Sequence, residues 1–193
     1  KQGTDAALAM ALWHVILKEF HLDRQSPYFT EYVRENTDLP MLVMLKRQGD
    51  GYVQDRFLRA SDLSGQLGEN NNPDWKTVAF DELGGDVVPP GGSIGFRWGE
   101  SGKWNIEQKT GDGQDVKLCL SLIDRRDEVV PVGFPYFGGS EHPYFTHSAH
   151  ESVQRRHVPV KKITLADGTE ILVATVFDLL CANYGIDRGL GGG

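Results

Sequence analysis

The chemically most informative tripeptide in the chain is Gly3-Thr4-Asp5, which stands just ahead of an apolar, helix-forming run. The N-terminus of a helix offers free backbone N–H groups and the positive end of the helix dipole to an anion. The carboxylate of Asp5 adds an acceptor that can take both donors on the Watson–Crick edge of a guanine. The tripeptide therefore predicts either a contact to a guanine nucleotide or plain capping of the helix, for which Thr and Asp are common residues.

Two glycine-rich segments match known motifs in part but lack their context. Residues 91–95 satisfy the G-x-S-x-G pattern of a hydrolase nucleophile, which needs a strand before it and a helix after it. Here two prolines precede the motif and a strand-like alternation follows it. Residues 99–103 resemble a phosphate-binding loop, but Arg97 and Trp104 stand where the Walker pattern needs Gly and Ser or Thr. We interpret both segments as turns beside strands.

The histidines and cysteines do not have the spacing of a metal site. Four histidines crowd one loop without a cysteine: His142, His147, His150 and His157. Zinc needs three or four converging ligands, so we expect solvent-exposed histidines there. Cys119 and Cys181 are too far apart for an iron–sulfur ligand set or a disulfide framework, and reduced thiols are expected. No catalytic or metal-ligating residue is predicted in this chain.

The element that must position Gly3-Thr4-Asp5 is a helix expected to run to about residue 20. Residues 6–13 and 15–17 are apolar on every side of such a helix, which predicts burial all round. The first five residues cannot supply the neighbours for this burial, so the sequence is expected to begin within a domain. His14 lies inside the run and is interpreted as a hydrogen-bonded core histidine.

The remaining elements predict helices at both ends and hairpins between them. A second helix is expected over Pro27–Asn36, with Ser26 as its cap, and a last one from Thr175 to about Tyr184, closed by Gly185. Strands are predicted at residues 41–45, 52–58, 75–80, 93–98, 103–108, 115–122, 158–165 and 170–174. Alternation within residues 115–122 puts Cys119 on the wetter face. No element is assigned to residues 128–156.

Composition bounds the class of protein. The chain has 193 residues, enough for one core, and a formal net charge of −7. This charge argues against a nucleic-acid partner, whose phosphates require clustered Lys and Arg. No apolar run approaches the ~20 residues that cross a bilayer, so no direct membrane span is expected.

Long stretches of the chain resemble the catalytic alpha subunit of respiratory, quinol-linked nitrate reductases, in the molybdopterin oxidoreductase (DMSO reductase) superfamily. They include GTDAALAMA, HVILKEFHLD, YFTEYVRENTDLPMLVML, SIGFRWGESGKWNIE, VGFPYFGG and ANYGIDRGL. They occur in order and cover most of the chain. The resemblance identifies the chain as an internal fragment of such a subunit.

The resemblance implies a parent with a large α/β molybdopterin-oxidoreductase fold, of which this segment is a mixed α+β part. Residues 1–39 would belong to the helical cofactor domain, 40–174 to a β-rich insertion and 175–190 to a short helix. The β-rich part would shape a substrate funnel or a subunit contact. Two features depart from the family: Trp13 replaces a small residue, and the glycine tail 191–193 is left out of site reasoning.

The implied activity is reduction of nitrate to nitrite at a molybdenum bis(molybdopterin guanine dinucleotide) cofactor, with electrons from quinol through iron–sulfur clusters. Gly3, Thr4 and Asp5 would contact the guanine dinucleotide. The molybdenum ligand and the ligands of the 4Fe-4S cluster would lie outside this segment, which alone would be inactive. The implied partners are an iron–sulfur beta subunit and a membrane cytochrome b gamma subunit, at the cytoplasmic face of the cell membrane.

Two alternatives remain open from the sequence. One is a related chlorate, perchlorate or selenate reductase, because the groups that select the oxyanion would lie outside the segment. The other is a non-catalytic, β-rich binding module in which Gly3-Thr4-Asp5 is only a helix cap. Such a module would unfold cooperatively as a monomer, whereas a piece of a larger core would aggregate or stay molten when expressed alone.

Overall fold

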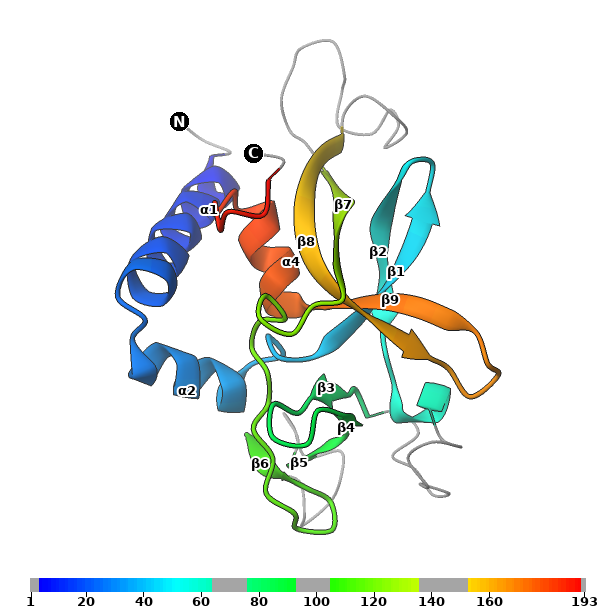
Figure 1. Ribbon diagram of the computed structural model, residues 1–193. Helices are drawn as coiled ribbons and strands as arrows, with labels where there is room; N and C mark the ends of the chain where they lie inside the picture. Colours follow the sequence, from blue (N-terminus) through cyan, green and yellow to red (C-terminus); the bar gives the residue numbers. More distant parts are fainter. Residues whose placement is uncertain (1–3, 64–75, 93–104, 136–152, 192–193) are drawn as a thin grey trace.

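A closed five-stranded barrel forms the centre of the chain (Figure 1). The computed structural model describes residues 4–63, 76–92, 105–135 and 153–191. The strand order in the barrel is β1-β2-β7-β8-β9, and β9 pairs with β1 to close it. All pairings are antiparallel except that of β2 with β7, which is parallel. The barrel strands are β1 (Leu42–Gln48), β2 (Gly51–Phe57), β7 (Glu128–Pro135), β8 (Val153–Thr164) and β9 (Glu170–Thr175).

The first four residues of strand β1, residues 42–45, are buried on both faces, which explains their continuous apolar sequence. Leu42 and Met44 belong to one core cluster, whereas Val43 and Leu45 belong to another. Because successive side chains of a strand point to opposite faces, a strand between two cores needs apolar residues at every position. The hairpin that residues 41–58 predict is confirmed, as is the hairpin of β8 and β9.

Strand β7 lies in a region to which the sequence analysis assigned no element. Val130, Val132 and Phe134 are buried at alternate positions, as in a strand, but Pro131 and Gly133 between them disguise the pattern. The parallel contact with β2 is close. A Cβ on Gly51 would lie 2.9 Å from the carbonyl oxygen of Pro131, so this position requires glycine. Residues 128–135 and 153–156, to which no element was assigned, therefore belong to strands.

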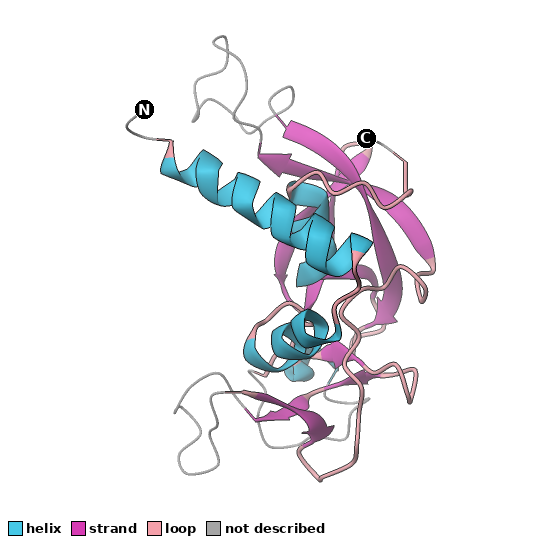
Figure 2. Ribbon diagram, turned by 90° about the vertical axis from the view of Figure 1, so that its left-hand side faces the viewer, coloured by secondary structure: helices cyan, strands magenta, loops and turns pink. Residues whose placement is uncertain are grey.

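The helices gather on one side of the barrel (Figures 1 and 2). The helix that was predicted to reach residue 20 is α-helical only as α1 (Asp5–Ile16), and it continues as a π-helix, η1 (Leu17–Asp23). Helix α2 (Pro27–Asn36) has the predicted bounds. A third apolar cluster joins η1, α2 and α4 (Val176–Asn183). Its buried members are Leu17, Val33, Leu39, Leu120, Phe177, Cys181 and Ile186.

Helix α4 has both ends that the sequence predicts. Its N-cap Thr175 accepts a hydrogen bond from the backbone N–H of Asp178. At the other end, Gly185 has φ +70°, and the N–H of Ile186 donates to the carbonyl of Cys181 at 2.9 Å. This is the left-handed glycine closure of a helix. The mixed α+β class expected for the segment is confirmed.

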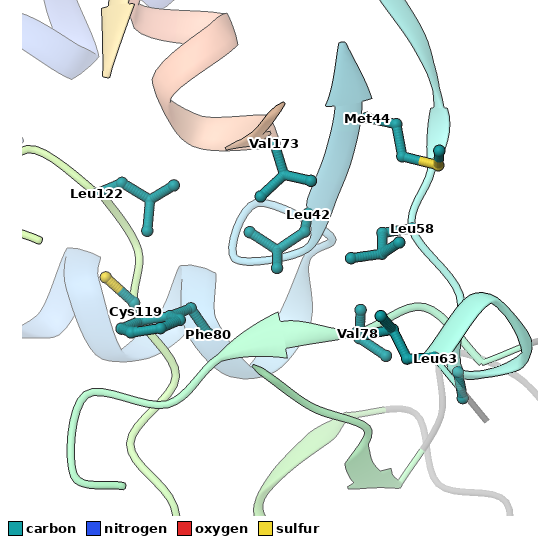
Figure 3. Close-up of a cluster of buried hydrophobic side chains, with 10 residues drawn as sticks. Leu42, Met44, Leu58, Leu63, Val78, Phe80, Cys119, Leu122 and Val173 are labelled. Atoms are coloured by element: carbon teal, nitrogen blue, oxygen red, sulfur yellow. The ribbon is translucent and has the colours of Figure 1, made fainter. Parts of the chain in front are cut away.

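The expected strand over residues 115–122 is wrong, and so is the wet face assigned to Cys119. The segment makes only isolated bridges, at Asp115 and Leu118. Cys119 is 1% exposed and packs in the same cluster as Phe80 and Leu122 (Figure 3). Lys117 is exposed as the alternation predicts, but Cys119 two residues later is covered by the cluster it packs in, so the alternation does not mark solvent along the whole segment.

Short elements complete the described chain below the barrel (Figure 1). Two two-stranded sheets pair β3 with β4 and β5 with β6. Of the strand predicted over residues 75–80, only β3 forms. The strand predicted over residues 103–108 corresponds to β6. The strand predicted over residues 93–98 lies outside the described residues. The bounds are η2 Ala60–Leu63, β3 Ala79–Phe80, β4 Val87–Val88, β5 Pro90–Gly92 and β6 Ile106–Thr110.

Candidate functional site

The predicted guanine contact lies at the N-terminus of α1. Helix α1 begins at Asp5, and the carbonyl of Thr4 accepts its first backbone hydrogen bond, from Leu8 at 3.0 Å. Thr4 is the N-cap residue, yet its side chain makes no cap hydrogen bond. The carboxylate of Asp5 is exposed in the first turn. Gly3 lies outside the described residues, so the structure places two of the three predicted residues, side by side at one helix end.

Helix α1 is held to the barrel side by few contacts, and none of its own residues is buried. Nδ1 of His14 donates to the carbonyl of Tyr184 at 2.7 Å, which ties α1 to the end of α4. The hydrogen-bonded histidine that was expected at this position is confirmed, although the side chain is half-buried. The apolar residues remain in solvent: Leu8 is 62% exposed, Leu12 56%, Val15 48% and Trp13 41%. The burial predicted for this helix is thus not provided within the described residues.

A buried ion pair, which sequence reasoning missed, joins α4 to the chain that follows it. The carboxylate of Asp178 is fully buried and accepts from Arg188 Nη1 at 2.6 Å. It also accepts from Ser121 Oγ at 2.6 Å, from the N–H of Leu122 at 2.7 Å and from Thr175 Oγ1 at 2.9 Å. Four donors thus compensate the loss of hydration of one carboxylate. The pattern T-x-x-D at residues 175–178 is the one available sequence signal, because it marks a capping residue.

The two cysteines are buried free thiols, as the sequence predicted for their redox state. Burial raises the pKa of Cys119 to about 12, and burial likewise raises the pKa of Cys181 to about 12. The thiolate is the reactive form of cysteine. At pH 9 an ordinary thiol is about three-quarters ionised, whereas these thiols are ionised in only about one molecule in a thousand.

We expect both thiols to resist iodoacetamide at pH 9 while the protein is native. Mass spectrometry of tryptic peptides should find Cys119 and Cys181 unmodified in the native sample and modified after unfolding in guanidinium chloride. Rapid modification of either cysteine in the native protein would show that its burial is not maintained in solution.

The remaining motifs give no second site within the described residues. His14 and His21 lie outside the predicted histidine loop. Of the four histidines in that loop, only His157 lies within the described residues. Its Nδ1 is buried and has no hydrogen-bond partner among the described residues. The expectation that this histidine is an exposed loop residue is wrong, because it belongs to β8. No group of three His, Cys, Asp or Glu side chains could hold a metal among the described residues. Residues 93–104, which contain most of both glycine-rich motifs, lie outside them.

Comparison with known proteins gives the chain its family. The respiratory nitrate reductase 1 alpha chain of Escherichia coli (strain K12) is 56% identical over 191 residues, which are 98% of this chain and 15% of that protein. The respiratory nitrate reductase alpha chain of a Bradyrhizobium species is 42% identical over 193 residues, 100% of this chain and 17% of that protein. The chain is homologous to a segment of respiratory nitrate reductase alpha chains. The nitrate reductase alpha chain of Bacillus subtilis (strain 168) is more distant, 38% identical over 194 residues.

The predicted resemblance to nitrate reductase alpha chains is confirmed over 98% of this chain. The chain spans only 15 to 17% of the length of these relatives. No family model matches the chain. Among the described residues, none of the helices is both long and apolar enough to cross a membrane.

Proposed function

We propose that the chain is part of the catalytic subunit of a molybdenum-dependent respiratory nitrate reductase, which reduces nitrate to nitrite with electrons from quinol. The observation that carries this proposal is the identity of 56% to an Escherichia coli nitrate reductase alpha chain over 98% of the chain. Identity of that degree, continuous through helices, barrel and loops, supports common ancestry of the whole segment rather than a shared motif. The electrons would pass through iron–sulfur clusters, one of them a 4Fe-4S cluster of the same subunit.

The N-terminus of α1 has the chemistry to hold the guanine end of a molybdenum bis(molybdopterin guanine dinucleotide). Guanine presents two adjacent donors, and the exposed carboxylate of Asp5 can accept both. The free N–H groups of the first helical turn and the helix dipole favour the negative charge of a nearby phosphate. Gly3 would allow close approach of the backbone, and Thr4 would contribute its hydroxyl beside Asp5.

Among the described residues, Asp5 belongs to no group of three His, Cys, Asp or Glu side chains that could hold a metal. When bound, the cofactor supplies the oxygen-transfer and redox chemistry of the reaction. This chain would bind and orient its nucleotide end, and the ligands of molybdenum and of the 4Fe-4S cluster would come from the rest of the subunit. We further propose that the parent assembles with an iron–sulfur beta subunit and a membrane cytochrome b gamma subunit at the cytoplasmic face of the membrane.

Replacing Asp5 by Asn in the full-length subunit is expected to lower both its guanine nucleotide content and its nitrate reduction at least about ten-fold. Asn keeps the size of the side chain, but its amide NH₂ would face one of the two guanine donors. That guanine donor would then have no acceptor, which costs about 1–3 kcal/mol or more. Nucleotide released by acid from the purified subunit is measured chromatographically, and nitrite formation is measured with a reduced viologen.

The matched control is Asp55→Asn, which changes an exposed carboxylate on β2. It should leave nucleotide content and activity unchanged. If Asp5→Asn behaved like this control, Asp5 would only be an acidic residue in the first turn of α1 and not a nucleotide contact. Assays of the wild-type enzyme with chlorate, perchlorate and selenate would show whether a related oxyanion is the better substrate.

A further inference from the structure

A cavity lined by both polar and apolar side chains lies between the π-helix η1, α2 and the segment before β7. Its volume is about 380 Å³, and the residues that line it do not include those of the proposed nucleotide contact at the start of α1. The side chains that matter for its chemistry are His21, Gln25, Arg34, Glu82 and Arg188, which come from four separate parts of the chain. A ligand could bind in this cavity whether or not the proposed nitrate reduction is correct.

The backbone at one wall of this cavity has two unusual features. Residues Leu17–Asp23 form a π-helix, a rare conformation that is frequent at functional sites. Two residues later, Gln25 has φ +48°, in the left-handed region that glycine favours. Both features carry a conformational cost, and both aim side chains of the wall, His21 and Gln25, at the same space.

Arg34 lines the cavity and has a guanidinium that its partners satisfy only in part. Its Nη2 donates to Glu82 Oε1 at 3.3 Å, but its Nε is buried and has no hydrogen-bond partner among the described residues. Glu82 has a closer contact elsewhere, because Lys117 Nζ lies 2.6 Å from its other oxygen. A guanidinium N–H that is removed from water without an acceptor is costly, so Glu82 does not fully satisfy the donors of Arg34.

Arg188 supplies the second guanidinium. Only 4% of its side chain is exposed, and its Nη1 is held by Asp178 at 2.6 Å. Its Nη2 has a longer bond, 3.4 Å, to the carbonyl of Asp178. Burial, followed by the positive charge of Arg188, lowers the pKa of His21, so the imidazole is neutral at pH 7 and retains one N–H donor. Glu82 and Asp124 are the carboxylates of the lining, and Asp124 is exposed.

We infer that this cavity is an oxyanion site, in which Arg34 and Arg188 hold a carboxylate or a small inorganic oxyanion between their guanidinium groups. The planar guanidinium group of arginine presents several N–H donors, and it matches such planar or multidentate acceptors better than any other side chain. The acceptor would come either from solution or from an acidic side chain elsewhere in the full-length subunit. A bound anion would compete with Glu82 for the guanidinium of Arg34.

The test uses two substitutions with opposite expected effects in the full-length subunit. Arg34→Gln removes the guanidinium, whereas Glu82→Gln removes the competing carboxylate and leaves the guanidinium in place. Thermal melting is followed with nitrate, phosphate or sulfate against chloride at equal ionic strength. Apparent affinities come from the concentration dependence of the midpoint. The matched control is Arg24→Gln, an exposed arginine at the end of η1 that pairs with Glu19.

If the acceptor is an anion from solution, we expect at least one of the three anions to stabilise the wild-type subunit. Its affinity should be at least ten-fold weaker in Arg34→Gln and tighter in Glu82→Gln. Arg24→Gln should not change the affinity. For an acceptor from the same subunit, added anions have no effect, and Arg34→Gln lowers the midpoint well beyond Glu82→Gln and Arg24→Gln. If Arg34→Gln and Glu82→Gln have equal effects in both measurements, the two residues form a structural ion pair and the inference fails.

Discussion

Replacing Asp178 by Asn destabilises the protein by about 3–5 kcal/mol, which is the expected cost of removing one partner of a buried ion pair. Arg188 would remain 4% exposed with its charge uncompensated. The amide of Asn could accept from only part of the four donors that now converge on the carboxylate. These donors come from the segment before β7, from the end of β9 and from the chain after α4, so their loss would loosen three parts of the fold together.

Thermal melting and limited proteolysis of the full-length subunit would measure this loss. The double variant Asp178→Asn, Arg188→Met removes both charges, and it should recover part of the stability because no buried charge is left unpaired. Asp115→Asn is the matched control. It breaks an exposed pair with Lys109, at 3.6 Å, in which the aspartate is 81% exposed, and exposed pairs contribute little. Equal melting temperatures for Asp178→Asn and Asp115→Asn would mean that the buried network does not stabilise the fold.

Local signals predicted the elements whose causes are local. The caps Thr175 and Gly185 set the ends of α4, and the apolar run of β1 marked a strand covered on both faces. Strand β7 escaped prediction because Pro131 and Gly133 interrupt its alternation, while the reason it is a strand is its pairing with β2 and β8, distant in sequence. Cys119 was misplaced for a related reason. Periodicity reports which side chains share a face, but it cannot report whether a second layer covers the other face.

The candidate sites divide in the same way. The tripeptide at residues 3–5 is contiguous, so its chemistry was readable from the sequence alone, although the described residues include only Thr4 and Asp5. Asp178 and Arg188 are ten residues apart, and their network reaches Ser121 across 57 positions. Arg34 and Arg188 meet at one cavity only through the fold. Such convergence is a property of tertiary structure, which one sequence does not display.

The second large effect is expected at the exposed face of α1. Leu8 and Leu12 lie four residues apart on one helix, and both are more than half exposed, at 62% and 56%. Burying a leucine stabilises a protein by about 1.5–3 kcal/mol, and relatives of this chain are about six times longer, at a coverage of 15 to 17%. We therefore expect the rest of the full-length subunit to cover this face and to hold the N-terminus of α1 at the nucleotide.

Leu12→Glu in the full-length subunit should then reduce the yield of soluble protein and its guanine nucleotide content at least about ten-fold, because an unpaired carboxylate cannot enter an apolar contact without a cost of several kcal/mol. Leu83→Glu is the matched control, since Leu83 is 68% exposed in the turn between β3 and β4. If both leucines tolerated glutamate equally, α1 would face solvent in the subunit as well. The N-terminus of α1 would then lack the support that a preorganised nucleotide site needs, which would weaken the proposed contact at Asp5.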